Sequence, residues 1–174
     1  MGSAPIHTDA PQQKSILDFV SPTEFVELPS RGLAYSEDHP LYGQDVIEIR
    51  YMTAKDEDIL TSETLLKKGI ALERLLENII VDKTIDPKTM LVGDRNAVII
   101  AARASGYGEA YETQVTCPNC GTGAQMTFDL SEPKLQELDY ENLEFITKNE
   151  TGNFLIKLPQ TDFSVEVRLL TGKD

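Results

Sequence analysis

The stretch Ala110-Tyr-Glu-Thr-Gln-Val-Thr-Cys-Pro-Asn-Cys-Gly-Thr-Gly-Ala-Gln-Met-Thr-Phe-Asp-Leu130 decides the second half of the fold. Apolar and polar residues alternate on both sides of its centre, with the period of two that is typical of strands. The central Cys117-Pro-Asn-Cys120-Gly121 has the proline and glycine of a tight turn. The stretch therefore predicts two paired strands, residues 110–116 and 125–130, joined by a turn that carries two cysteines.

The chain that follows this hairpin is also rich in strand patterns. Ser131 is placed to cap a short helix over residues 131–138. Apolar and β-branched residues then favour strands over residues 143–147, 154–158 and 163–170. The short connection at residues 159–162 predicts that the last two of these strands form a second hairpin.

The chain before the cysteine stretch begins with strands and continues with helices. Residues 25–28 and 46–52 have strand composition, and Gly32 suits the turn between them because glycine tolerates a positive φ. Thr53 and Asp56 have the spacing of a capping box, which predicts a helix over residues 54–60.

Further helices are expected before the cysteine stretch. One runs from Ser62 or Gly69 to residue 80, and Gly69 is able to break it near its start. Its shared apolar face consists of Leu72, Leu75, Leu76 and Ile79. Asp86 and Pro87 begin a third helical element, because proline is favoured at the first helical position.

The last helix of this half is predicted over residues 95–105, between a cap and a stop. Asp94 is a good N-cap and Gly106 a good stop. The order of elements then indicates an α+β fold. Residues 23–174 form a single domain with a helical part at about 53–106 and a β-rich part at about 109–170. Residues 1–22 form a flexible N-terminal arm.

Composition and charge exclude several classes of protein. The chain has 174 residues, of which 16 are basic and 29 acidic, so its net charge is −13. This acidity repels polyphosphate, and residues 112–128 contain no Lys or Arg, so nucleic acid is not an expected partner. The longest apolar run, residues 97–102, is too short to span a membrane. The N-terminus has neither the basic flank nor the apolar stretch of a secretory signal.

Cys117 and Cys120 are the candidate metal ligands. Two thiolates in a Cys-x-x-Cys-Gly turn occupy two corners of a Zn²⁺ tetrahedron, and zinc needs four donors. The chain has only these two cysteines and two histidines, His7 and His39. The other half of the site comes from His39, from carboxylates or from the same cysteines of a second copy. A metal-free hairpin tip and a thiol-redox pair are the alternatives, and redox fits poorly because the motif does not open a helix.

Other polar clusters have simpler interpretations than catalysis. Asp94, with Arg95 and Asn96 beside it, caps a helix, and the two neighbours tether a loop. The acidic run at residues 56–58 forms a solvated first helical turn and lacks the spacing of a calcium loop. The sequence contains no nucleophile elbow, zinc-protease motif or Walker loop. We therefore expect a protein that is not an enzyme and has no catalytic residues.

Several segments in order resemble one family. They are Leu28-Pro-Ser-Arg-Gly-Leu-Ala-Tyr35, the strand at residues 46–51, Met52-Thr-Ala-Lys-Asp-Glu-Asp-Ile-Leu60, Leu91-Val-Gly-Asp-Arg-Asn96, Gly106-Tyr-Gly108 and Val115-Thr-Cys-Pro-Asn-Cys120. Their order and spacing resemble a family of small proteins from T4-type contractile-tailed bacteriophages, usually named for the baseplate hub and its assembly. The resemblance covers about residues 25–170.

The resemblance implies a phage protein that is made in the host cytoplasm and builds the baseplate hub by contact with other tail proteins. It supplies no catalytic residues. The alternative is a chaperone-like assembly factor that does not remain in the virion. We expect an oligomer whose apolar anchors come from Phe19 and Val20, from the loop at residues 33–42 with Tyr35 and Tyr42, and from Tyr107 and Tyr111.

Overall fold

A two-stranded antiparallel ribbon begins the folded body. β1 (Thr23–Glu27) pairs with β2 (Val46–Arg50), and Val26 lies opposite Ile47. The computed structural model that shows this describes residues 21–131, 146–161 and 163–174. The alternation predicted for β2 is present, because Ile47 and Ile49 are buried while Glu48 and Arg50 are partly exposed. The two predicted strands are therefore confirmed, with shifted ends, and they pair with each other.

Three short helices follow β2. They are α1 (Ala54–Thr61), α2 (Glu63–Lys67) and α3 (Ala71–Ile79). Gly69 separates α2 from α3 with a φ of +70°, which is the break that the sequence predicted. Leu75, Leu76 and Ile79 are buried, but Leu72 is 44% exposed. The predicted apolar face is thus correct for three of its four leucine and isoleucine positions.

The fourth helix is longer than predicted. α4 (Val92–Tyr107) begins three residues before the expected start, and Leu91, not Asp94, occupies its N-cap position. The helix passes through Gly106 and ends at Gly108, whose φ of +90° breaks it. The helix expected at Asp86 and Pro87 is wrong, because this part of the chain forms turns.

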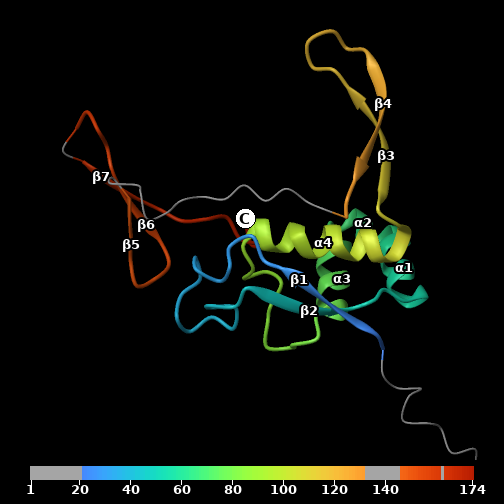
Figure 1. Ribbon diagram of the computed structural model, residues 1–174, viewed down its shortest axis with the longest axis horizontal. Coiled ribbons are helices and arrows are strands. Elements are labelled where there is room, and N and C mark those ends of the chain that lie inside the picture. The colour runs from blue at the N-terminus through green and yellow to red at the C-terminus, as the bar shows by residue number, and fades with distance from the viewer. Residues whose placement is uncertain (1–20, 132–145, 162) are drawn as a thin grey trace, which may run out of the picture.

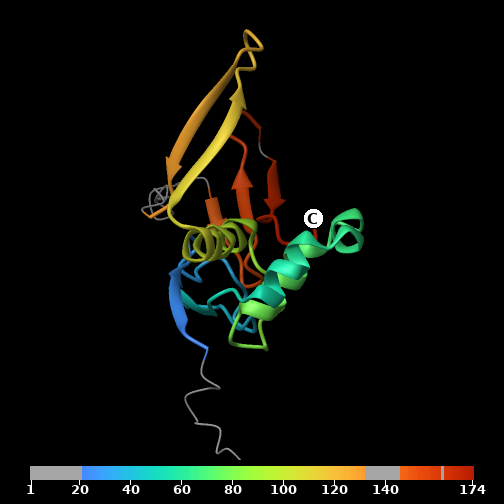
Figure 2. The same ribbon diagram turned by 90° about the vertical axis from the view of Figure 1, so that its right-hand side faces the viewer.

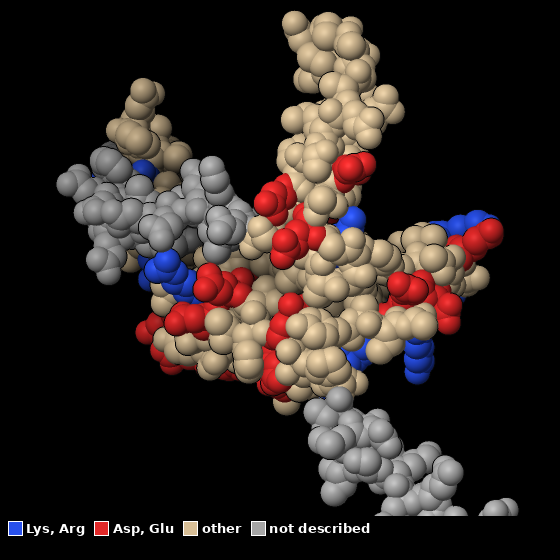
Figure 3. All heavy atoms as spheres, turned by 45° about the vertical axis from the view of Figure 1, so that its right-hand side comes forward, with Lys and Arg blue, Asp and Glu red and all other residues tan. Residues whose placement is uncertain are grey.

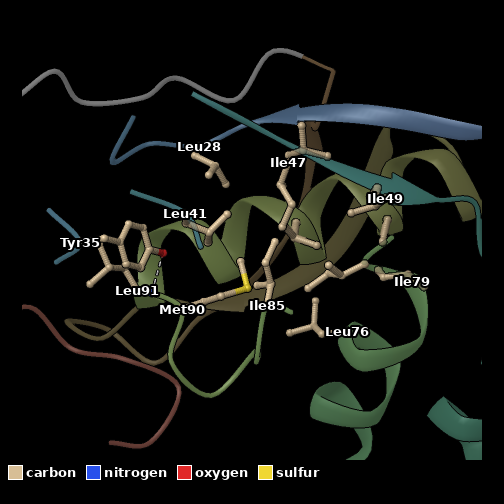
Figure 4. Packing of buried hydrophobic residues seen from close by; sticks show 14 of the residues in the cluster. Leu28, Tyr35, Leu41, Ile47, Ile49, Leu76, Ile79, Ile85, Met90 and Leu91 are labelled. Carbon is tan, nitrogen blue, oxygen red and sulfur yellow. Dashed lines mark hydrogen bonds between the residues drawn. The ribbon is translucent and has the colours of Figure 1, made fainter. Parts of the chain in front are cut away.

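The hydrophobic core lies between the β1–β2 ribbon, α3 and α4 (Figures 1 and 4). Figure 4 shows side chains from the ribbon and the 28–41 loop pointing toward those of α3 and the 85–91 turn. The fully buried large apolar side chains are Leu28, Leu41, Ile49, Leu76, Ile79, Ile80, Met90 and Val98. This core holds α4 in place, and the remaining β structures are attached at the two ends of this helix.

Two β structures extend from the body in different directions (Figures 1 and 2). β3 (Ala110–Thr116) and β4 (Gly123–Asp129) form an antiparallel hairpin that starts just after α4. β5 (Ile146–Lys148), β6 (Phe154–Lys157) and β7 (Ser164–Val167) form a three-stranded antiparallel sheet. The α+β class is therefore confirmed, and the two strands predicted on either side of the cysteine turn are paired.

The three-stranded sheet is attached near the first turn of α4. Phe154 from β6 belongs to the buried core, and Lys148 Nζ donates to the carbonyl oxygen of Leu33. The segment after β7 returns to the body, where Val92 N donates to Leu170 O at 2.9 Å and Gly172 N donates to Met90 O at 3.0 Å. The hairpin and the sheet are thus anchored at opposite ends of α4.

Some predictions fall on residues that the structure does not describe. The arm, apart from its last two residues, the helix at residues 132–138 and the first part of the strand at residues 143–147 lie outside the described ranges. Among the described helices, none is long and apolar enough to cross a membrane.

Candidate functional site

The β3–β4 hairpin has one apolar and one polar face. Tyr111 lies opposite Phe128, and Thr113 lies opposite Met126. Side chains at alternate positions of a strand share a face, so the first face carries Tyr111, Thr113, Val115, Ala124, Met126 and Phe128. The other face carries Glu112, Gln114, Thr116, Gln125 and Thr127. We call the first set the apolar hairpin face.

The apolar hairpin face is exposed to solvent. Tyr111, Val115, Met126 and Phe128 are between 39% and 43% exposed. A two-stranded hairpin that stands alone is marginally stable in water, and exposed apolar residues gathered on one surface are typical of a binding site. The hairpin therefore has the surface character of a contact element.

The outer part of the hairpin is free of charge. Residues 113–128 contain no Asp, Glu, Lys or Arg, although the whole chain has a net charge of −13. Figure 3 shows the acidic side chains around the base of the hairpin and over the body, while the outer hairpin is uncharged on the visible face. A partner with either sign of charge can approach this part without strong repulsion.

The two cysteines lie at the tip of the hairpin. The turn is closed by two hydrogen bonds, from Gly121 N to Cys117 O at 2.9 Å and from Cys117 N to Thr122 O at 3.0 Å. Gly121 has a φ of +72°, which brings the chain back after Cys120. Both cysteines are free thiols, and Cys120 is exposed. The turn thus holds both sulfur atoms at the end of the hairpin.

Hydrogen bonds around Cys120 make its thiol easier to ionise. Cys120 Sγ lies 3.4 Å from Thr122 Oγ1. Hydrogen bonds from the side chain and backbone of Thr122, and then from the Cys117 thiol, lower the pKa of Cys120 below its usual value. A thiolate is both the metal ligand and the nucleophilic form of cysteine. The turn therefore prepares Cys120 for either chemistry and brings Cys117 beside it.

His39 is not placed to complete a metal site in the same chain. Its Nε2 lies 2.9 Å from Thr89 Oγ1, and its Nδ1 accepts a hydrogen bond from Leu41 N at 3.1 Å. Thr89 precedes the start of α4, whereas the hairpin follows its end, and a 16-residue helix spans about 24 Å. The described residues contain no group of three or more His, Cys, Asp or Glu that could hold a metal ion.

Asp94 is a buried structural tether. It is fully buried and accepts hydrogen bonds from Ser30 N at 2.9 Å, Ser30 Oγ at 2.6 Å and Tyr35 Oη at 2.7 Å. Tyr35 Oη in turn accepts a hydrogen bond from Leu91 N at 3.0 Å (Figure 4). Burial, and then the Asp94 charge, raise the pKa of Tyr35 far above its usual value. The tether was predicted for Arg95 and Asn96, but these hydrogen bonds assign it to Asp94.

This tether also corrects the role predicted for Tyr35. The sequence placed Tyr35 among the exposed anchors, whereas its ring is 4% exposed and stacks on His39 with the ring centroids 4.3 Å apart. Nothing in the sequence pattern links Ser30 and Tyr35 to a helix some sixty residues later. Tyr42, Tyr107 and Tyr111 are exposed, as the anchor prediction requires.

Asp56 is also buried, which corrects the solvated interpretation for this residue, whereas Glu57 and Asp58 are exposed as predicted. Its carboxylate accepts two hydrogen bonds from Arg50, at 2.7 and 2.9 Å, and one from Thr53 N at 2.9 Å. Although burial raises the pKa of Asp56, the hydrogen bonds from Arg50 and Thr53 hold it well below its usual range. The predicted capping box is therefore confirmed, and its Asp56 also forms an ion pair with Arg50 of β2.

A groove lies between β1 and α4, with a volume of about 690 Å³. Its ionisable lining residues are Glu24, Glu27 and Glu109, and the described lining includes no Cys, His, Lys or Arg. General acid–base and nucleophilic catalysis need a nucleophile and a base within reach of each other. The lining serines donate elsewhere: Ser105 Oγ donates to Ala102 O at 3.4 Å, and Ser131 Oγ donates to Asp129 Oδ1 at 2.7 Å.

Residues 24–171 match the protein family described as T4 bacteriophage base plate protein. The chain belongs to this family. The match covers most of the chain, including the hairpin, the tether and the three-stranded sheet, and it confirms the resemblance to T4-type baseplate proteins. No curated protein and no solved structure matches the chain.

The polar tether of this baseplate protein connects segments by which the sequence resembles the family. The segments at residues 28–35 and 91–96 were two of those that carried the resemblance, and Ser30, Tyr35, Leu91 and Asp94 join them by hydrogen bonds. A baseplate protein works in a structure made of many protein subunits. The apolar hairpin face is one of the exposed apolar surfaces of this baseplate protein.

Proposed function

We propose that this baseplate protein is a component or assembly factor of the baseplate hub, and that it acts by protein–protein contact without catalysis. The observation that carries the proposal is the apolar hairpin face, which extends from the body and is exposed along its length. Burial of apolar area drives most protein association, and the best anchors are large apolar and aromatic side chains. Tyr111, Met126 and Phe128 have this character.

Two further observations support a contact function. The body has a continuous core, so the hairpin does not need its own apolar face for the packing of that core. In the groove between β1 and α4, the hydroxyls of Ser105 and Ser131 donate to Ala102 O and Asp129 Oδ1 and not to a glutamate of the lining. The proposed partners are other hub or tail proteins, and nucleic acid is disfavoured because the hairpin has no basic residue between Glu112 and Phe128.

The test compares two substitutions on adjacent residues of β4. Met126→Asp places a charge on the apolar hairpin face, while Gln125→Asp places the same charge on the polar face. We expect that an affinity-tagged protein isolated from infected cells recovers other tail proteins, identified by mass spectrometry. Met126→Asp should reduce this recovery at least tenfold, and Gln125→Asp should leave it within twofold of the unsubstituted protein.

The hub assignment has its own result in the same experiment. Chemical cross-linking before isolation identifies the direct neighbours of the hairpin. Cross-links to central hub proteins support the hub, whereas cross-links only to peripheral wedge or sheath proteins contradict it. Equal recovery with Met126→Asp and Gln125→Asp contradicts the contact function of the apolar face.

The alternative is a tail-assembly chaperone that leaves before the particle is complete. It uses the same apolar face but differs in the time at which the face is occupied. Quantitative mass spectrometry of purified virions distinguishes the two. A stoichiometric amount of the protein in the virion supports a structural hub component, and its absence from virions, with strong recovery from infected cells, supports the chaperone.

A further inference from the structure

We propose that the hairpin tip is half of a zinc site and that a second copy of this chain completes it, with Cys117 and Cys120 of each copy as the four ligands. The inference does not depend on the hub assignment. It concerns one feature, the two-cysteine turn at residues 117–121, and one occupant, the same turn of another copy.

The first argument is the donor set. Zn²⁺ in structural sites takes four ligands in a tetrahedron, and sulfur-rich sites are the most common of these. The turn carries two free thiols, three positions apart in the chain, at the end of the hairpin. The two hydrogen bonds between Cys117 and residues 121 and 122 fix the backbone that carries them. The tip therefore offers two neighbouring corners of a tetrahedron.

The second argument is that the described part of the same chain does not supply the other two corners. His39 is engaged by Thr89 and Leu41 near the far end of α4. The nearest carboxylate along β3 belongs to Glu112, five residues from Cys117, which is about 17 Å in an extended strand. An identical turn of a second copy supplies two further thiols, which completes the four ligands of a tetrahedral zinc site.

The third argument is electrostatic. Two chains with a net charge of −13 repel each other, but the repulsion is screened beyond a Debye length of about 8 Å at physiological salt. Seven-residue strands extend the tip about 24 Å from the base of the hairpin. Two copies that meet tip to tip keep their acidic bodies well separated. The outer hairpin itself, residues 113–128, is uncharged.

The fourth argument is symmetry. A twofold axis through the metal ion makes the two turns equivalent, and it brings the same surface of each hairpin to the other. The apolar hairpin face starts directly beside the turn, with Val115 and Ala124. These side chains are placed to shield the zinc–sulfur bonds from water in the paired arrangement. Binding converts four thiols to thiolates and releases four protons, so acid weakens it.

The experiment uses the full chain, purified with a non-thiol reductant and freed of metal by a chelator. Co²⁺ is the probe, because tetrahedral Co²⁺ with sulfur ligands absorbs strongly in the visible range and Zn²⁺ then displaces it. We expect the absorption to saturate at one Co²⁺ per two chains. Native mass spectrometry of the zinc-loaded protein should show a dimer with one Zn²⁺, which separates into monomers when the chelator is added.

Three variants make the result specific. Cys117→Ser and Cys120→Ser should each lose the cobalt absorption and the metal-dependent dimer. Asn119→Ala changes the same turn but keeps both thiols, and it should retain both readouts. Circular dichroism of each metal-free variant confirms that the fold is unchanged.

Several results overturn the proposal. They are a monomer with one metal ion per chain, no cobalt absorption in the unsubstituted protein, and a dimer that persists after metal removal and in both serine variants. Recovery of tail proteins by the serine variants leaves the hub proposal intact. Failure of the zinc site and failure of the hub function are therefore separate outcomes.

Discussion

Within the core, the hydroxyl of Tyr35 both donates and accepts a hydrogen bond. It donates to Asp94 Oδ2 at 2.7 Å and accepts from Leu91 N at 3.0 Å, so one oxygen joins the 28–44 loop to the first turn of α4. A buried polar group that loses its partner costs about 1–3 kcal/mol. The tether therefore contributes to the stability of the fold.

Tyr35→Phe should lower the free energy of unfolding by about 2 kcal/mol, because it leaves Leu91 N–H and one Asp94 oxygen without this partner. Urea denaturation followed by circular dichroism measures the change. Tyr42→Phe is the matched control, since Tyr42 is an exposed tyrosine of the same loop, and it should change the free energy by less than about 0.5 kcal/mol. Equal effects of the two substitutions would contradict the role of the tether.

The buried Asp56 carboxylate makes stability depend on pH. Its folded pKa is lower than its unfolded value of about 3.9, so its contribution is complete above about pH 5 and is lost as the pH falls through the folded pKa. Asp56→Asn should cost about 2 kcal/mol at pH 7, and the gap to the unsubstituted protein should narrow below about pH 4.

The measurement for Asp56 is a series of urea denaturations between about pH 3 and pH 7. Asp58→Asn is the control, because it removes the same charge from an exposed position of α1. It should show a small effect without that narrowing. A gap for Asp56→Asn that stays constant with pH would contradict the ion pair with Arg50.

Residue patterns predicted the local part of these interactions and missed the distant part. The spacing of Thr53 and Asp56 indicated the capping box, but the burial of Asp56 depends on Arg50 in a neighbouring strand. Asp94 was recognised as a helix-start residue, yet its partners come from a loop about sixty residues away. Short-range spacing carries no information on which loop packs against a helix end.

At the scale of elements, the turn between β1 and β2 depends on a glycine with no space for a side chain. Gly32 has a φ of +68°, and a Cβ atom there would lie 2.4 Å from Gln44 N and 2.5 Å from Leu41 O. Both of these are backbone atoms that belong to the same loop. The backbone of residues 41–44 therefore packs directly on Gly32, which the sequence identified only as a turn residue.

Gly32→Ala should destabilise the protein by about 3 kcal/mol or more, since it adds backbone crowding to the cost of a positive φ. Gly43→Ala is the matched control, because Gly43 has a φ of +66° with nothing within 4 Å of its Cβ position. It should cost only about 1 kcal/mol. Thermal and urea denaturation of both variants measure the difference, and equal costs would show that crowding at Gly32 has no effect.

Element prediction succeeded for the periodic hairpin strands and for the break at Gly69, and it failed for the helix expected at Asp86 and Pro87. The period of two gave β3 and β4 with nearly correct ends, and Gly69 correctly divided α2 from α3. Asp86 and Pro87 suggested a helix, but that segment forms turns whose Asp86 side chain accepts from Lys88 N. Aspartate and proline favour a turn as readily as a helix start, so these two residues do not distinguish them.

At the scale of the whole molecule, the core and the hairpin are separate units. None of the buried core residues in the described chain comes from β3 or β4. We therefore expect that replacing residues 113–126 with an Asn-Gly turn, which joins the paired positions Glu112 and Thr127, leaves the body folded. The melting temperature should change by less than about 4 °C, which corresponds to about 1 kcal/mol.

Scanning calorimetry measures that change, and circular dichroism checks that the helices remain. A broad or non-cooperative transition in the shortened protein would show that the hairpin supports the core. The whole-molecule arrangement was not predictable from the sequence. Amphipathic alternation indicates an apolar face, but whether that face packs on the protein's own core or remains exposed depends on the direction in which α4 ends.

The connection of the hairpin to α4 also determines how the protein carries mechanical load. When a partner held at the tip pulls outward, tension passes along the covalent backbones of both strands in parallel, and no hydrogen bond between them has to break. The load reaches the base, where Leu130 N donates to Glu109 O and Arg103 donates to Gly108 O beside the rings of Tyr107 and Tyr111. A contact made at the tip can therefore withstand more force than the same contact made at the edge of a strand.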